Sequence, residues 1–182
     1  MRYIKAMVTF IIILIIIQLY VNKPIEFENA LQQKGIAEHI LHVEDLGKQR
    51  IVFYKNYLDS ENKQGLAAGI FEQDNAGNWS FSTGGGWLYT YTPSFTWNTQ
   101  WTRTSTLDEW NRIEVLFGYA TDPNINRVGV LIGGNEIEAT LFEPENWNSF
   151  WFSIIILEDI LDIEEIKAYS IYDEVLYTIT FP

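Results

Sequence analysis

The fold is specified most sharply by the stretch from Arg127 to Leu141, which reads RVGVLIGGNEIEATL. On each side of Gly133-Gly134-Asn135, apolar and polar residues alternate with a period of two, which is typical of β-strands with one buried face. We expect a hairpin whose tight turn lies at those three residues, because glycine accepts positive φ without strain. One face should enter the core, and it carries Val128, Val130, Ile132, Ile137, Ala139 and Leu141. The other face carries Glu136, Glu138 and Thr140.

Outside this hairpin, short apolar runs separated by turn residues predict about nine or ten strands in total. Strands are expected at 37–45, 49–58, 66–73, 112–117, 149–157, 166–171 and 175–181. Ser149 to Leu157 is apolar on both faces and therefore predicts a central strand. Residues 24–35 predict a short helix that ends at Gly35. The predicted fold class is mainly β, an antiparallel sandwich or two packed sheets with one short N-terminal helix, preceded by a single transmembrane helix.

The transmembrane prediction rests on the 17 uncharged residues from Ala6 to Asn22, between Lys5 and Lys23. As a helix rising about 1.5 Å per residue, this run is roughly 26 Å long, close to the ~30 Å hydrocarbon core of a bilayer. Phe10 to Ile17 is uninterrupted apolar sequence. We therefore expect residues 1–23 to form a cytoplasmic tip and a membrane anchor, and residues 24–182 to form the domain.

The flanking charges predict the orientation of this anchor. Arg2 and Lys5 precede it and Glu26 follows it, so the positive-inside rule places the N-terminus in the cytoplasm and the domain outside the cell membrane. Residues 18–24 lack the small side chains of a signal-peptide cleavage site, which favours an uncleaved, single-pass anchor.

Composition argues against several classes of function. Residues 24–182 carry all 24 acidic residues but only nine of the 12 basic ones, and this balance repels phosphate backbones and anionic lipid. We therefore expect no nucleic-acid partner. Cysteine is absent, which removes disulfides, thiol catalysis and thiolate zinc sites. The chain has no nucleophile elbow, phosphate loop, dinucleotide fingerprint or H-E-x-x-H motif, so we expect a protein that is not an enzyme and has no cofactor.

Several loosely patterned segments carry a family resemblance. They are Ile40-Leu41-His42, Ile51-Val52-Phe53-Tyr54, Gly84-Gly85-Gly86, Leu116-Phe117-Gly118, Asp122-Pro123-Asn124-Ile125, Trp151-Phe152 and Ala168-Tyr169. With these segments the chain resembles small uncharacterised membrane-anchored or secreted envelope proteins of Gram-positive spore-forming bacteria. The resemblance implies an extracytoplasmic domain, and it implies no activity and no catalytic residue.

Three groups of residues have the composition of a metal site, and each has a simpler interpretation. His39 and His42 would point to opposite sides of a strand, so they are interpreted as structural. Asp122 to Asn126 begins like a calcium loop but has Arg127 and Gly133 where glycine and glutamate are needed, which favours a plain turn. The acidic residues between Glu158 and Glu165 are interpreted as a solvated loop. We expect no metal.

The strongest candidate for binding is the uncharged stretch from Asn75 to Trp101, which is rich in aromatic residues. The candidate ligand or interface residues are Trp87, Tyr89, Tyr91, Trp97 and Trp101. Such a row fits a hydrophobic core, a protein interface or a platform for sugar rings. The leading hypothesis is a non-enzymatic domain that binds an envelope protein, and the alternative is a glycan-binding module that uses residues 79–101. A hydrolase ranks third and would require two convergent carboxylates beside a cleft.

Overall fold

The computed structural model describes residues 24–58, 63–89, 94–104, 111–157 and 163–181. The expected anchor and the acids Glu158, Asp159 and Asp162 lie outside these ranges. Within them, no helix is long and apolar enough to cross a membrane.

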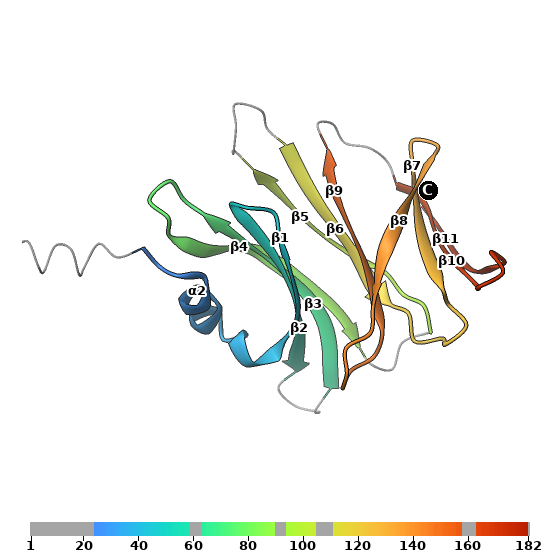
Figure 1. Cartoon of the computed structure of the whole chain (residues 1–182), viewed down its shortest axis with the longest axis horizontal. Helices are drawn as coiled ribbons and strands as arrows, with labels where there is room; N and C mark the ends of the chain where they lie inside the picture. The colour runs from blue at the N-terminus through green and yellow to red at the C-terminus, as the bar shows by residue number, and fades with distance from the viewer. Residues whose placement is uncertain (1–23, 59–62, 90–93, 105–110, 158–162, 182) are drawn as a thin grey trace, which may run out of the picture.

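The described residues form two antiparallel sheets and one short α-helix, α2 (Phe27–Lys34) (Figure 1). The four-stranded sheet has the order β1 (Ile40–Asp45), β2 (Gln49–Leu58), β3 (Lys63–Gln73), β4 (Trp79–Tyr89). The seven-stranded sheet has the order β11 (Val175–Thr180), β10 (Ile163–Tyr169), β7 (Arg127–Ile132), β8 (Asn135–Phe142), β9 (Phe150–Leu157), β6 (Asn111–Tyr119), β5 (Asn98–Thr104). The predicted mainly β fold of two packed antiparallel sheets is confirmed.

The predicted N-terminal helix is confirmed and covers the outer face of the four-stranded sheet. Its buried face packs on Val52, Tyr54, Ala67, Phe71 and Trp79. The Phe27 ring meets the rings of Phe71 and Trp79 edge-on, with centroids 5.5 and 5.3 Å away. Gly35 ends the helix in the left-handed region at φ 76°, as a C-terminal glycine should. The next expected strand begins later than predicted, because residues Ala37–His39 form a 3-10 turn.

Phenylalanine dominates the layer between the two sheets. Phe53 of β2 lies 6.1 Å from Phe117 of β6 and 4.5 Å from Phe152 of β9, measured between ring centroids. All three side chains are buried. Burying large aromatic rings contributes a substantial part of a domain's hydrophobic stabilisation, so this layer holds the sheets together.

The seven-stranded sheet also encloses a second core on its other face. This core draws buried residues from five of its strands: Leu116, Val128, Val130, Ile132, Ala139, Trp151, Ile155, Ile166 and Ala168. The Trp97 and Phe181 rings, from just before β5 and just after β11, meet edge-on with centroids 4.5 Å apart. The two ends of the sheet are therefore brought together, and the sheet curls around this core.

Two alternation patterns need correction. In the hairpin of β7 and β8, the predicted turn and register are confirmed, with Val130 opposite Ile137 and positive φ at Gly133 and Gly134. Ile137, however, is not a core residue, because 40% of it is exposed. In β6, Ile113, Val115 and Phe117 alternate with Arg112, Glu114 and Leu116, yet Glu114 and Leu116 are buried as well.

The burial of both faces of β6 has a simple cause. The four-stranded sheet covers the face of β6 that carries Phe117, and the second core covers the face that carries Leu116. A central strand of a sheet covered on both sides has no solvent face, so period-two alternation stops being informative there.

Candidate functional site

A fork between β8 and β9 is the first notable feature of the surface. The two strands pair only near their connection, at Thr140–Phe152, Leu141–Trp151 and Phe142–Phe150. Beyond these pairs β8 continues against β7 and β9 continues against β6, and the two strands diverge (Figure 1). Within the described ranges, residues 135–139 and 153–157 therefore have a strand on one side only. Every second residue of such a strand turns its N–H and C=O toward the open side.

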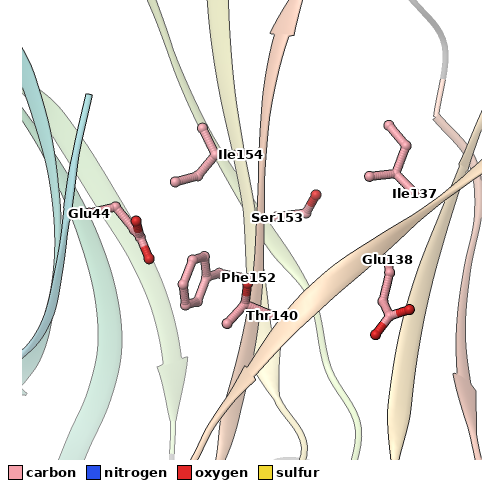
Figure 2. Close-up of a pocket in the computed structure, with 7 residues that line it drawn as sticks. All are labelled: Glu44, Ile137, Glu138, Thr140, Phe152, Ser153 and Ile154. Carbon is pink, nitrogen blue, oxygen red and sulfur yellow. The ribbon is translucent and has the colours of Figure 1, made fainter. Parts of the chain in front are cut away.

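A pocket of about 240 Å³ lies at the base of this fork. Its lining comes from β1, β8 and β9: Glu44, Ile137, Glu138, Thr140, Phe152, Ser153 and Ile154. Figure 2 shows Glu44 and Glu138 on opposite sides of Phe152 and Ser153. The pocket thus combines an apolar floor with two negative groups, and none of the described residues that line it is basic.

His42 explains how one wall of the pocket is held. Its ring packs against Phe142 and Phe152, with centroid distances of 4.6 and 5.3 Å. Its Nε2 is hydrogen-bonded to Glu44 Oε1 at 2.7 Å. The interpretation of His42 as a structural residue therefore agrees with its contacts, and it positions the Glu44 carboxylate beside the pocket.

The second notable feature is the turn between β10 and β11. Three large apolar residues are exposed at this place: Ile171 by 72% and Tyr172 by 82% in the turn, and Val175 by 53% at the first position of β11. The strand predicted for 166–171 ends instead at Tyr169, which places Ile171 in the turn. We call Ile171, Tyr172 and Val175 the hairpin tip.

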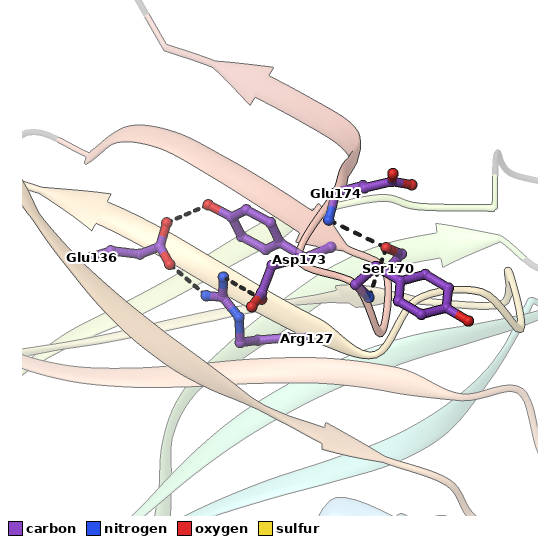
Figure 3. A network of polar contacts seen from close by, with 7 residues as sticks. Arg127, Glu136, Ser170, Asp173 and Glu174 are labelled. Carbon is purple, nitrogen blue, oxygen red and sulfur yellow. Dashed lines mark hydrogen bonds and ion pairs between the residues drawn. The ribbon is translucent and has the colours of Figure 1, made fainter.

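Hydrogen bonds fix the backbone of the hairpin tip (Figure 3). Ser170 Oγ accepts from the N–H groups of Tyr172 and Glu174, at 3.1 and 3.2 Å. The Ser170 N–H donates to the Glu174 carbonyl at 2.9 Å, and Asp173 takes the left-handed conformation at φ 58°. The apolar side chains are therefore presented on an ordered turn.

A polar latch on the outer face of the sheet ties this turn to the neighbouring strands. Arg127 of β7 is paired with Glu136 of β8 and, at 3.4 Å, with Asp173 of the turn (Figure 3). Its guanidinium also lies 3.8 Å from the centroid of the Tyr169 ring. The Tyr169 hydroxyl donates to the other oxygen of Glu136. We call these four residues the latch.

The electrostatics of the latch follow from these contacts. The hydrogen bond from Tyr169, then that from Arg127, lowers the pKa of Glu136. The hydrogen bond to Glu136 in turn raises the pKa of Arg127. Gly129 leaves room for the carboxylate, because a Cβ there would lie 2.5 Å from Glu136 Cδ. The charged form of each partner is favoured, which suits a structural connection.

Of the five aromatic residues predicted as the site, only Trp97 and Trp101 have side chains in the described part of the chain. The side chains of Trp87 and Tyr89, and all of Tyr91, lie outside that part. Trp97 is half-buried against Phe181. Trp101 is 48% exposed, and the Arg112 guanidinium lies 4.8 Å from its ring centroid.

Beneath Trp101, the buried carboxylate of Glu114 is satisfied within the sheet. It accepts a hydrogen bond from Thr99 Oγ1 at 3.0 Å and pairs with Arg112 Nη2 at 3.2 Å. These partners account for an acidic residue in a buried strand, since a buried charge is tolerated when it is paired and hydrogen-bonded.

The described residues contain no group of three or more potential metal ligands. Asp122 forms a turn in which its Oδ1 accepts the Asn124 N–H at 2.9 Å, while its Oδ2 accepts the Tyr177 hydroxyl at 2.8 Å. Glu164 and Glu165 also have partners, namely the Gly134 N–H and Lys167.

The sequence carries a local signal for one of these two sites. Ile171-Tyr172 beside Asp173-Glu174 places large apolar residues at an expected turn, where polar residues are the rule. The fork left no local signal, because it depends on where two strands stop pairing. Comparisons with protein-family models, with curated proteins and with solved structures find no match for this chain.

Proposed function

We propose that this chain is a non-enzymatic, membrane-anchored protein of the bacterial cell envelope, and that its extracytoplasmic domain binds another envelope protein through the hairpin tip. The observation that carries the proposal is the exposure of Ile171 and Tyr172 on an ordered turn and of Val175 at the start of the strand that follows it. Exposed apolar residues gathered in one place are typical of interaction sites, and a tyrosine is a frequent source of binding energy in interfaces.

The rigidity of the tip supports this role. Ordering a side chain or a loop on binding costs free energy, and a turn that is already ordered avoids part of that cost. Ser170 and the latch order the backbone without covering the apolar side chains. Stabilising a turn in this way is useful when the turn presents a binding residue.

The charge around the tip favours a protein partner over a lipid surface. Asp173 and Glu174 adjoin Tyr172, and an acidic turn is repelled by anionic headgroups. The tip also lies toward the opposite end of the molecule from α2, which follows the proposed anchor (Figure 1). An anchored domain would thus direct the tip away from its own membrane.

Site-specific crosslinking in intact cells tests the proposal. A photoreactive amino acid at position 172 should capture one defined envelope protein, whereas the same amino acid at Ala76, exposed in the turn between β3 and β4, should not. Ile171→Ser and Val175→Ser should each weaken the capture while leaving stability within about 0.5 kcal/mol, because both side chains are exposed.

Ser170→Ala tests whether the order of the turn matters apart from its apolar side chains. This substitution keeps all three apolar side chains but removes the acceptor for two backbone N–H groups. We expect weaker capture with Ser170→Ala as well, because the tip loses order. Equal capture from positions 172 and 76, or capture that survives all three substitutions, would contradict the proposal.

The anchor and its orientation are tested separately. Protease added to intact protoplasts should degrade the residues after about Lys23, because the flanking charges place the domain outside. Full protection of the domain would reverse the proposed topology and leave the role of the hairpin tip open to the crosslinking test.

A glycan-binding module is the second candidate function, and the exposed Trp101 ring favours it. An exposed indole backed by a guanidinium offers one flat face to a sugar ring. Trp101→Ala should then abolish retention on cell-wall glycan while leaving crosslinking from position 172 unchanged. The hydrolase hypothesis requires two convergent carboxylates. Glu44 and Glu138 both line the pocket, but they lie on opposite sides of Phe152 and Ser153 (Figure 2), and Glu44 is hydrogen-bonded to His42.

A further inference from the structure

We infer that the fork between β8 and β9 is a binding site for an extended, basic segment of a partner protein, which adds to the free edge of β9 and places one lysine or arginine side chain in the pocket. This site is distinct from the hairpin tip, and its occupant is defined by three properties of the fork: its unpaired edges, its size and its charge.

The unpaired edges call for a strand. Residues 153–157 of β9 are paired with β6 alone among the described strands, although β9 lies inside the seven-stranded sheet. An extended peptide that adds to such an edge gains main-chain hydrogen bonds, and its alternate side chains point into pockets beside the edge. The pocket lies directly beside this edge, because Ser153 and Ile154 belong to its lining.

The size of the pocket points to one side chain. A volume of about 240 Å³ is below the roughly 300 to 1,000 Å³ of sites that hold a drug-sized ligand or cofactor. The apolar floor of Phe152 and Ile154 suits the aliphatic stem of a long side chain. Lysine and arginine bury such stems while their charged ends stay among polar groups.

The charge of the pocket selects a basic side chain. Glu44 and Glu138 border the pocket from two different strands, and Thr140 and Ser153 add hydroxyl groups (Figure 2). Both carboxylates attract a cationic side chain that enters the pocket, whereas they repel an acidic one. The excess of acidic over basic residues in the whole chain reinforces this preference at longer range.

The test measures binding of defined peptides to the full chain in detergent micelles by fluorescence anisotropy. The probe is a labelled seven-residue peptide of alternating valine and threonine with one central lysine. It should bind, and the same peptide with a central glutamate should not. A version with alternate backbone amides methylated should also lose binding, because it cannot complete a strand.

Substitutions in the chain assign the binding to the fork. Glu44→Gln and Glu138→Gln should each lower the affinity for the lysine peptide about tenfold, which corresponds to about 1.4 kcal/mol of binding free energy. Glu28→Gln removes the same charge from the exposed face of α2 and should leave the affinity unchanged. These exposed or half-exposed positions tolerate amide side chains, so loss of folding does not confuse the result.

Three outcomes would overturn the inference. The first is that the lysine peptide does not bind. The second is that Glu28→Gln lowers the affinity for this peptide as much as Glu44→Gln and Glu138→Gln do. The third is that the methylated peptide binds as tightly as the unmethylated one. None of these outcomes bears on the hairpin tip, because the crosslinking test uses different residues on a different hairpin.

Discussion

Val130 and Ile137 are cross-strand partners that differ sharply in burial, and truncating each of them tests the fork. The two residues are opposite each other in β7 and β8, yet Val130 is fully buried and Ile137 is 40% exposed. If one face of the hairpin were uniformly buried, Ile137→Ala should lower the free energy of unfolding more than Val130→Ala, because Ile→Ala in a core costs about 2 to 5 kcal/mol. The fork predicts the reverse order.

The magnitudes follow from the atoms removed. Val130→Ala deletes two buried carbons at about 0.8 kcal/mol each and leaves a small cavity, so its cost should be about 2 to 3 kcal/mol. Ile137→Ala deletes three carbons that are already partly in water and face the open fork, so its cost should be about 1 kcal/mol or less. Glu138→Lys, on the exposed face, should change stability by no more than about 0.5 kcal/mol.

Urea denaturation measures these differences in a version of the chain that begins at Pro24. The slope of the free energy of unfolding against urea should stay the same in all three variants, which confirms that only stability has changed. If Ile137→Ala is the more destabilising truncation, then Ile137 is buried in solution. The fork, and the peptide site inferred from it, would then have to be given up.

Three further predictions concern close packing and titration. Gly118→Ala should cost about 2 to 4 kcal/mol in urea denaturation, because its Cβ would lie 1.8 Å from the Thr96 carbonyl oxygen and neither backbone can easily move. The pKa of Glu136 is lowered in the fold, chiefly by the hydrogen bond from Tyr169, so its stabilisation holds above the unfolded pKa and is lost as pH falls through the folded value. Glu136→Gln should therefore destabilise the chain at neutral pH and much less in acid, as followed by melting temperature. Burial raises the pKa of Tyr119 to about 12, so ultraviolet titration should show one tyrosine that ionises only near that pH or on unfolding.

Local patterns in the sequence predict the parts of the fold that depend on neighbours along the chain. The glycine pair at Gly133-Gly134 determines both the turn and the register of its hairpin, because only a positive φ closes so tight a connection. The helix that ends at Gly35 follows from the same kind of reasoning. The apolar residues on both faces of Phe150–Leu157 likewise predict that this strand lies inside a sheet and not at its edge, as it does.

The errors concern burial that depends on distant segments. Glu114 looks like a solvent-facing residue by alternation, yet the curl of the sheet covers it and Thr99 and Arg112 satisfy its carboxylate. Ile137 looks like a core residue, yet β8 leaves β9 before reaching it. In both cases the deciding contact is a strand far away in sequence, which no period-two pattern contains.

The candidate sites also differ in whether neighbouring residues in the sequence indicate them. The aromatic stretch was conspicuous because of its composition, but composition does not distinguish Trp97, which packs on Phe181, from the exposed Trp101. The hairpin tip carries a local signal, since Ile171 and Tyr172 occupy a turn. Glu44 and Glu138 come from separate sheets, and they line one pocket only in the folded chain.

The latch requires β8 to be held against β7 and β10, whereas the fork requires the other edge of β8 to stay apart from β9. Different residues of the hairpin of β7 and β8 serve these two purposes. Glu136 is held by Arg127 and Tyr169, so the start of β8 is fastened to β7 and β10. Glu138, two residues later on the same face, borders the pocket instead of the latch. Because β8 is secured on its β7 side, its opposite edge stays apart from β9 without the strand being free to move. A fork fixed in this way can accept an added strand at low conformational cost, just as the ordered tip can meet a partner, and both surfaces therefore depend on the same latch.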